Sequence, residues 1–291
     1  MKKSVLIIII IVVVLLPSLL LLNKCKKHST PQDQPIAIAS WNLKNIGQSK
    51  FNDPARIDII IDVLKNYDII AIQEVKDISL QLPQLLVAKM NEDGSNYNVV
   101  ASDRVGRNVF EQYLFVYDDD KIDYVPSTKG YGIESNDEFA REPFYAMFRS
   151  GNFDFYLLNI HTDPDDVAIE IPALKAAYVD LQNNTPNEND IILLGDFNGK
   201  APDVIAGSYI TMDTIAQIPN IIFTINEETN TRGGKAYDNI IFQDNYTSEY
   251  SNSSGVNTFW LPYGLEEDQG FSISDHKPVW AVFNIPDTDD D

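Results

Sequence analysis

The chain has 291 residues, a net charge of −21 and a single cysteine. One cysteine excludes a domain held by an intramolecular disulfide or by a cysteine-based zinc site. The negative charge argues against nonspecific polyphosphate binding through a broad basic surface, although divalent cations can invert the local field at a phosphate site.

The first 30 residues have the pattern of an export or membrane signal. Lys2 and Lys3 precede an apolar run from Val5 to Leu22. A basic start and an apolar body are typical of signal peptides, and the run is nearly long enough to span a bilayer. Cys25 resembles a lipoprotein cysteine, but the two residues before it match such sites poorly. Residues 1–30 are therefore expected to be a retained membrane anchor or a cleaved or lipidated signal peptide. The protein is expected to be extracytoplasmic, either secreted or tethered to the membrane by this segment.

Residues 36–285 are predicted to form one α/β domain, followed by an acidic tail at residues 286–291. The length suits a single large domain, and no linker rich in Gly, Ser or Pro divides it. A core of this size can be stable without disulfides. We expect a monomer.

Short apolar runs rich in β-branched and aromatic residues recur through the domain and predict strands. In chain order these runs span residues 36–41, 68–72, 113–117, 144–148, 153–160, 190–194, 239–242 and 279–283. Two segments predict helices. One spans 54–65, with Asp53 as N-cap and Pro54 at the first helical position, and the other spans about 165–181. Two packed sheets with helices outside would satisfy this pattern.

Two of the three histidines lie in the domain, at predicted strand edges beside carboxylates. His161 ends the apolar run 153–160, and His276 follows Asp275 just before the last strand, whereas His28 lies in the N-terminal flank. Histidine is the side chain whose ordinary pKa suits proton transfer near neutrality. The two domain histidines therefore indicate an acid–base site.

Polar side chains that flank the strands supply what phosphodiester hydrolysis requires. A hard cation held by carboxylates stabilises charge, histidine–carboxylate pairs move protons, and Asn and Arg hold the phosphate. Each residue alone has an ordinary explanation as a solvated loop end or a turn. The indication comes from the ordered set Asn42, Glu74, Glu111, Arg141, His161, Asp196, Asn198, Asp238, Asp275 and His276.

Six ordered segments resemble the endonuclease/exonuclease/phosphatase superfamily. They are Trp41-Asn42, Ile72-Gln-Glu74, Asn159-Ile-His161, Gly195-Asp-Phe-Asn198, Tyr237-Asp238 and Ser274-Asp-His276. Further segments resemble its deoxyribonuclease I branch, namely Gln73–Asp77, Gly106–Asn108, Glu111–Phe115, Phe139–Pro143 and His161–Leu181. The resemblance runs from about Ile36 to Phe283. It implies a four-layer α/β/β/α sandwich of two mainly antiparallel sheets with outer helices, and a site at one edge of the sheets.

The resemblance also implies a role for each site residue. His161 would be the proton donor, paired with Glu111, and His276 the base that activates water, oriented by Asp238. Glu74 would bind Mg²⁺ or Mn²⁺, and Asp196 and Asp275 would serve the metal or the attacking water. The substrate-binding set would be Asn42, Lys44, Lys76, Arg141 and Asn198, acting on DNA that is expected to be double-stranded.

Structural Ca²⁺ is a further expectation from the resemblance. Asp137 with Glu142, and Glu227 with Thr229 and Thr231, are oxygen-rich candidates at matching positions. Ordinary acidic surface loops explain both groups equally well.

The chain departs from the family pattern at several places. The family's loop disulfides are absent, and the loop between Gly106 and Glu111 is one residue shorter. Val109 or Phe110 stands where an aromatic phenol packs against the sugar. Lys44 and Lys76 stand where arginine is usual, and lysine offers a point charge instead of a fork. These changes concern affinity and cleavage preference rather than reaction type.

Two other functions stay open at this stage. A membrane-associated phosphodiesterase of the same superfamily would act on sphingomyelin or phosphoinositides, which the N-terminal segment would favour and the Arg141 and Glu111 segments disfavour. A degenerate domain that only binds a partner would lack site residues, and none of the expected set is missing.

Overall fold

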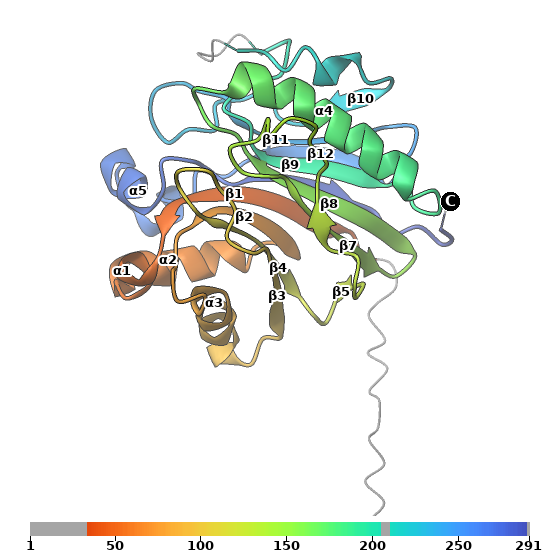
Figure 1. The fold of residues 1–291 in the computed structure, drawn as a ribbon. Coiled ribbons are helices and arrows are strands. Elements are labelled where there is room, and N and C mark those ends of the chain that lie inside the picture. The colour runs from red at the N-terminus through yellow and green to blue at the C-terminus, as the bar shows by residue number, and fades with distance from the viewer. Residues whose placement is uncertain (1–33, 205–209, 290–291) are drawn as a thin grey trace, which may run out of the picture.

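The computed structural model describes residues 34–204 and 210–289, which form two stacked sheets with helices on both outer faces (Figure 1). One sheet has the order β12-β13-β1-β2-β4-β3, and the other has the order β10-β11-β9-β8-β7-β5, with β6 also paired to β7. The strands are β1 (Ile36–Ile46), β2 (Ile69–Val75), β3 (Tyr97–Ala101), β4 (Gln112–Asp118), β5 (Asp123–Tyr124), β6 (Gly130–Tyr131), β7 (Phe144–Ser150), β8 (Phe153–His161), β9 (Ile191–Asp196), β10 (Ile221–Phe223), β11 (Asp238–Gln243), β12 (Tyr250–Val256) and β13 (Val279–Phe283). The helices are α1 (Gln48–Phe51), α2 (Pro54–Leu64), α3 (Leu82–Met90), α4 (Val167–Asn184) and α5 (Glu267–Ile273).

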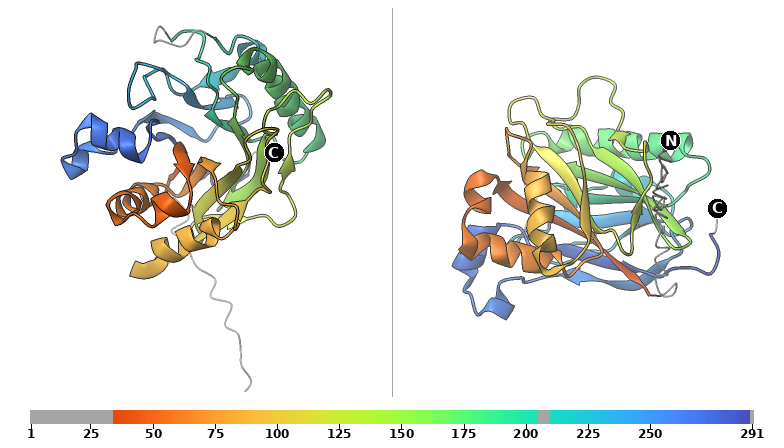
Figure 2. Two further views of the ribbon diagram at one scale, coloured as in Figure 1. Left: turned by 60° about the vertical axis from the view of Figure 1, so that its left-hand side comes forward. Right: turned by 90° about the horizontal axis from the view of Figure 1, so that it is seen from below.

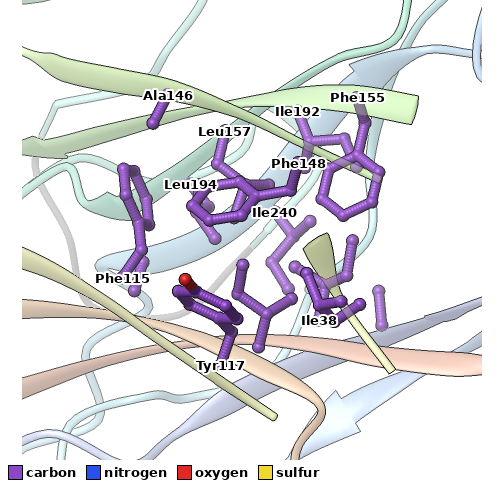
Figure 3. Close-up of a cluster of buried hydrophobic side chains, with 14 of the residues drawn as sticks. Ile38, Phe115, Tyr117, Ala146, Phe148, Phe155, Leu157, Ile192, Leu194 and Ile240 are labelled. Carbon is purple, nitrogen blue, oxygen red and sulfur yellow. The ribbon is translucent and has the colours of Figure 1, made fainter. Parts of the chain in front are cut away.

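The central core lies between the two sheets and is rich in aromatic rings. Figure 3 shows Ile38, Phe115 and Tyr117 of one sheet facing the inner side chains of the other, which include Phe148 and Phe155. The ring of Phe115 stacks on Phe144 and meets Phe148 edge to face, with centroids 5.4 Å apart in both pairs. Because both faces of these strands are covered, their sequences read as continuous apolar runs.

Two further apolar clusters lie under the helices. Trp41, Ile60 and Leu86 belong to the cluster that joins α2 and α3 to the first sheet, and Ile171 and Leu174 belong to the cluster that joins α4 to the second. Figures 1 and 2 show α1 to α3 on one side of the stacked sheets and α4 on the other. The expected four-layer α/β/β/α sandwich is confirmed. Only β1–β2 and β8–β9 are parallel pairs, so the sheets of the described part of the chain are mainly antiparallel.

The two predicted helices form close to their expected positions. In α2, the side chain of Asp53 accepts a hydrogen bond from Ala55 N at 3.1 Å, and Pro54 occupies the first turn. This is the N-cap arrangement that the sequence predicts. The second helix, α4, begins at Val167, two residues after the predicted start, and continues to Asn184.

The N-terminal prediction lies outside the described residues. Residues 1–33 are not described, and these include Cys25 and the apolar run. Within residues 34–204 and 210–289, no helix combines the length and the apolar character needed to cross a membrane. The described chain enters β1 at Ile36 and reaches Trp41 and Asn42 later in that strand.

Candidate active site

Strand register brings the predicted site residues to one edge of the sandwich. Asn42, Glu74, His161 and Asp196 stand in the last part of β1, β2, β8 and β9. Asp196 pairs with His161 across the parallel β8–β9 ladder and with Asp238 across the antiparallel β9–β11 ladder. Because register fixes these neighbours, Asp196 lies between the two histidine-bearing halves of the site.

The first half contains the His161–Glu111 pair. His161 Nδ1 lies 2.5 Å from Glu111 Oε1, and Glu111 is fully buried. Burial alone would lower the pKa of His161, but the Glu111 carboxylate outweighs burial and raises it. The backbone N–H of His161 donates to the Tyr113 hydroxyl at 3.0 Å. The imidazole is therefore held in one orientation, with Nε2 turned toward Asp196.

The second half contains the His276–Asp238 pair. His276 Nδ1 lies 2.8 Å from Asp238 Oδ2, and that same oxygen accepts a hydrogen bond from the Thr229 hydroxyl at 2.6 Å. Burial opposes protonation of His276, but the carboxylates of Asp238 and Asp196 outweigh it and raise the pKa of His276 to about 10. The Trp41 indole N–H donates to the His276 carbonyl at 2.8 Å and anchors its backbone.

Both histidines face the same carboxylate oxygen. Asp196 Oδ2 lies 3.6 Å from His161 Nε2 and 3.5 Å from His276 Nε2. The Asn42 amide also donates to this oxygen at 3.0 Å. The two imidazoles therefore open onto one shared space, which is the arrangement that proton removal and proton donation on one substrate require.

Local backbone geometry aims the groups of this edge into the shared space. Gly195 has a φ of +142° beside β8, where a Cβ would collide with the Ile160 carbonyl, so only glycine allows β9 to approach so closely. Glu74 has a φ of +61°, and the β2–β4 register shifts between Ile72 and Val75. Such irregularities re-aim side chains and persist where the surroundings enforce them.

Glu74 joins the site through Asn42 and Asn45. The Asn42 side chain donates to Glu74 Oε1 at 3.0 Å, and Asn45 N donates to Glu74 Oε2 at 2.9 Å. Burial would raise the pKa of Glu74, but attraction to His161 and Lys76 and the Asn42 hydrogen bond lower it overall. Glu74 is thus held as a carboxylate beside the shared space.

The predicted cations lie around this space. Arg141 Nε donates to the His161 carbonyl at 2.9 Å and lies 3.5 Å from Glu111, while its Nη2 is buried without a hydrogen-bond partner among the described residues. The Arg141 side chain lines a cavity of about 100 Å³, together with Arg107 and Asn108. Lys76 Nζ lies 3.5 Å from Glu74 and 3.9 Å from Glu111.

The remaining predicted substrate and metal residues occupy the rim. Lys44 Nζ lies 3.5 Å from Asp275 Oδ2 and 3.5 Å from the centroid of the Phe271 ring. Asn198 has a φ of +45°, and its amide donates to the Thr162 carbonyl at 2.9 Å. Val109 and Phe110, in the shortened loop, are 49% and 47% exposed.

The residues present fit a divalent cation. Oδ1 of Asp238 and Oδ1 of Asp275 are buried and have no hydrogen-bond partner among the described residues. Ligand atoms of Asp196, Asp238 and His276 also lie within 4.8 Å of one another. Buried carboxylate oxygens are costly unless they are paired or coordinate a metal, and a carboxylate-rich set suits Mg²⁺ or Mn²⁺. Of the three predicted ligands, this group contains only Asp196. Glu74 is linked to Asp196 through the Asn42 amide, and Asp275 precedes His276 in the chain.

The candidate Ca²⁺ residues lie in two different settings. Asp137 and Glu227 are exposed, and Glu142 is half-buried. Thr229 and Thr231 are buried and serve the catalytic edge instead, because Thr229 donates to Asp238 and the Thr231 hydroxyl donates to the Ser274 carbonyl at 2.8 Å. Binding of Ca²⁺ at either place stays a prediction.

Several residues that hold the site were given no role from the sequence. Ser274 donates to the Asn42 carbonyl at 2.5 Å and accepts from His276 N at 3.1 Å. Glu170 of α4 accepts from Ala140 N at 3.0 Å and so fixes the segment that carries Arg141. Lys50 donates to three carbonyls near the edge. Ser274 belongs to a quoted motif and Glu170 to a quoted segment, but nothing in the sequence singled out Lys50.

Comparison with known proteins identifies the family to which the chain is similar. Residues 39–206 match the profile of the Endonuclease/Exonuclease/phosphatase family. The chain is 32% identical over 259 residues to human "Deoxyribonuclease gamma", covering 84% of both chains. It is 32% identical over 257 residues to bovine "Deoxyribonuclease-1", covering 84% of this chain and 90% of the relative.

Solved structures share the fold at low sequence identity. The human Nocturnin catalytic domain aligns with a TM-score of 0.59 and 15% identity, covering 88% of this chain and 98% of that one. A functionally unknown conserved protein from Enterococcus faecalis aligns with a TM-score of 0.56 and 15% identity, covering 86% and 100%. At such identity the likeness concerns the fold alone.

Proposed function

The chain belongs to the endonuclease/exonuclease/phosphatase family as a deoxyribonuclease I-like member, and from that premise we propose that it is an endonuclease that hydrolyses phosphodiester bonds of DNA. Its reaction would use a divalent cation and two histidines in general acid–base roles. The substrate is proposed to be double-stranded DNA and the enzyme a monomer. One observation carries the proposal, namely that both buried histidine–carboxylate pairs face the same Asp196 oxygen.

His276 is proposed as the base that activates water. Its Nδ1 is committed to Asp238, so Nε2 is the atom that would accept a proton once a bound cation offsets the carboxylates that raise the pKa of His276. The pair is buried, so the imidazole cannot turn away without breaking contacts with Asp238 and with the Trp41-anchored backbone. Fixed orientation of this kind is what a general base needs.

His161 is proposed as the acid that protonates the leaving oxygen. The Glu111 carboxylate raises its pKa, which favours the imidazolium form at neutral pH. With Nδ1 committed to Glu111, the proton on Nε2 is the one that can be donated. The proton taken at His276 and the proton given at His161 balance the hydrolysis.

Asn42 and Arg141 are proposed to hold the phosphate between the histidines, with Asn198 beside them. Asn42 is already placed by Glu74 and Asp196, and the buried Nη2 of Arg141 has an unused donor. Fixed donors of this kind stabilise charge on phosphate oxygens without reorganisation during the reaction.

The carboxylates Glu74, Asp196 and Asp275 are proposed to hold the cation, as Mg²⁺ or Mn²⁺. When bound, the ion supplies positive charge next to the phosphate oxygens and offsets the carboxylates that raise the pKa of His276. Glu74 is kept in place for this role by Asn42 and by the Asn45 amide.

An extracytoplasmic location is proposed from the N-terminal sequence. Asn42 follows Ile36 by six residues on β1, which corresponds to about 20 Å of extended strand. A tether that precedes residue 34 would therefore join the domain at the opposite end of β1 from the catalytic edge. Such a placement would leave the edge open to DNA.

The lipid phosphodiesterase alternative is not favoured. The curated relatives that match most of the chain are named deoxyribonucleases. Assays of sphingomyelin and phosphoinositide beside plasmid DNA distinguish the two functions.

The test is nicking of supercoiled plasmid by the full chain with Mg²⁺ or Mn²⁺. We expect nicking that EDTA abolishes and that falls at least about 100-fold in His161→Ala and in His276→Ala, the scale of general acid–base catalysis. His28→Ala is the matched control and should nick like the wild type. Faster turnover of sphingomyelin or phosphoinositide than of plasmid, or full activity of His161→Ala, would overturn the proposal.

A further inference from the structure

Lys50 of α1 is a buried lysine whose every donor is used. Its side chain is among the buried charged groups at 7% exposure. Nζ donates to the carbonyls of Leu43 at 2.8 Å, Lys44 at 2.7 Å and Ile273 at 2.6 Å. An ammonium has three N–H donors, so three carbonyls satisfy it completely. Lysine is rarely buried without such pairing.

Two of these carbonyls belong to the irregular stretch of β1, where its register with β2 shifts between Asn42 and Ile46. Lys44 and Asn45 have φ values of +43° and +55°, a conformation that costs energy for residues other than glycine and persists only where contacts enforce it. The amides of this stretch hold the site directly. Lys44 N donates to Asn42 Oδ1 at 2.9 Å, and Asn45 N donates to Glu74 Oε2 at 2.9 Å.

The third carbonyl belongs to the segment that carries the second histidine. Ile273 is the last residue of α5 and stands directly before Ser274, Asp275 and His276. Figures 1 and 2 show α5 beside α1, although the two helices are far apart in the sequence. The Lys50 ammonium joins them, and Ser274 makes a second link to the Asn42 carbonyl.

We propose that Lys50 is a positioning residue for the catalytic edge, holding the Asn42–Glu74 side and the Asp275–His276 side at the spacing that cation binding and catalysis require. This inference rests on the function proposed above. Lys50 touches neither proton-transfer histidine, so it acts only through the two segments that it joins.

The cost of placing Lys50 here supports a role beyond packing. Burial, with repulsion from Arg56 and Lys44, lowers the pKa of Lys50 to about 8, while Asp275 and Glu74 act in the opposite direction. A buried charge is a poor device for stability alone, because apolar residues of similar volume often serve as well. Asp275 and Glu74, the two carboxylates that raise the pKa of Lys50, are both proposed cation ligands.

The decisive variant is Lys50→Met, which keeps the length of the side chain and removes its three donors. We expect the dissociation constant for Mn²⁺, measured by electron paramagnetic resonance on the full chain without DNA, to rise at least about tenfold, as for other residues that orient metal ligands. With plasmid, kcat should fall about 100-fold, the cost of small misplacement, while KM changes less than about threefold.

Leu86→Ala is the control for lost stability, because Leu86 is 1% exposed in α3 and belongs to the cluster under the helices. It should lower the unfolding temperature and leave Mn²⁺ affinity and kcat unchanged where the protein is folded. Lys50→Gln, which retains two donors, replaces Lys50→Met in the same measurements if Lys50→Met does not fold. It should give Mn²⁺ affinity and kcat below those of the wild type and above those of any folded Lys50→Met.

The outcomes separate the two proposals. A wild-type chain that binds Mn²⁺ and does not nick plasmid would contradict the proposed function. A wild type that does both, with wild-type Mn²⁺ affinity and kcat in folded Lys50→Met or Lys50→Gln, overturns the positioning role alone. Loss of Mn²⁺ affinity in Leu86→Ala equal to that in the Lys50 variant would also overturn it.

Discussion

The two histidine–carboxylate pairs share Asp196 but have different electrostatic surroundings. Glu111 of the His161 pair has Arg141 at 3.5 Å and Lys76 at 3.9 Å. Both histidines face Asp196, but His276 also has Asp238 and Asp275 near it, and these carboxylates raise its pKa to about 10 although burial opposes them. The His161 pair therefore has cations beside its carboxylate, and the His276 pair has further carboxylates.

The same difference bears on the proposed proton transfers. The surroundings raise the pKa of both histidines, so opposite roles depend on what offsets the carboxylates of each pair. Glu111 Oε2 is buried without a hydrogen-bond partner among the described residues, but it lies 3.9 Å from Lys76 Nζ, and Arg141 lies 3.5 Å from Glu111 Oε1. Oδ1 of Asp238 and Oδ1 of Asp275 are also buried without a hydrogen-bond partner among the described residues, and a divalent cation would offset the negative charge on this side.

The largest expected effect comes from removing each carboxylate charge in turn. Glu111→Gln and Asp238→Asn should each lower kcat about 100- to 1,000-fold at neutral pH. Glu111→Gln removes the main group that raises the pKa of His161, so that burial and Arg141, which lower this pKa, are opposed by Asp196 alone among the named groups. The pKa of His161 should therefore fall in this variant, and the imidazole should regain its proton at lower pH.

The pH–rate profiles of the two variants test the different roles of the two histidines as acid and base. Activity of Glu111→Gln should recover partly as the pH falls, because the acid is reprotonated. Activity of Asp238→Asn should not recover, because a base that has lost its orienting carboxylate gains nothing from protonation. Identical profiles for the two variants would contradict the assignment of acid and base. Glu92→Gln, an exposed carboxylate in the turn after α3, is the matched control that should retain the wild-type profile.

The sequence predicted the strands and helices whose burial is reflected in an apolar composition. Strands covered on both faces, such as β8 and β9, read as apolar runs, and the histidines and acids that follow them were visible as motifs. Eight strands and helices of the described residues were missed, namely β3, β5, β6, β10, β12, α1, α3 and α5, and three of them show the physical reasons. Helix α3 has only nine residues, α5 contains Gly270 packed against Trp260, and β12 is a polar edge strand.

The supporting contacts of the site were beyond sequence reasoning. Lys50 and Ser274 act on backbone carbonyls, and a carbonyl acceptor leaves no residue-type signature. Thr229 stood out only as an oxygen-bearing candidate for Ca²⁺, whereas its hydroxyl donates to Asp238. Contacts between segments more than 200 residues apart, such as that of Lys50 with Ile273, depend on topology that one sequence does not specify.

A smaller effect is expected from Arg141→Lys, which tests the cation-rich side. Lysine keeps the charge beside Glu111 but loses the buried Nη2 donor and the bond from Nε to the His161 carbonyl. We expect kcat/KM for plasmid to fall about 10- to 100-fold, the value of one or two charge-assisted hydrogen bonds. Arg149→Lys, at a surface pair with Asp154, is the matched control and should cleave normally. An unchanged Arg141→Lys would remove Arg141 from the substrate site.

The smallest expected effect is on stability in EDTA, where the carboxylate-rich pair lacks its cation. The folded-state pKa of His276, about 10, lies above the ordinary value of about 6.5. A pKa raised on folding contributes stability that is complete below the unfolded pKa and is lost as the pH rises through the folded pKa. The free energy of unfolding should therefore fall between about pH 6.5 and about pH 10. In His276→Gln the free energy of unfolding should fall less steeply over this range. Added Mg²⁺ should reduce this difference in slope, because it offsets the same carboxylates. Two other groups also titrate in this range. His161, whose pKa is raised, makes the fall with pH steeper, and Lys50, whose pKa is lowered to about 8, makes it shallower. Both are present in the wild type and in His276→Gln, so the difference between the two proteins isolates the carboxylate-rich pair. Urea unfolding at several pH values measures both slopes, and equal slopes in EDTA would show that His276 is not held as an imidazolium in the metal-free protein.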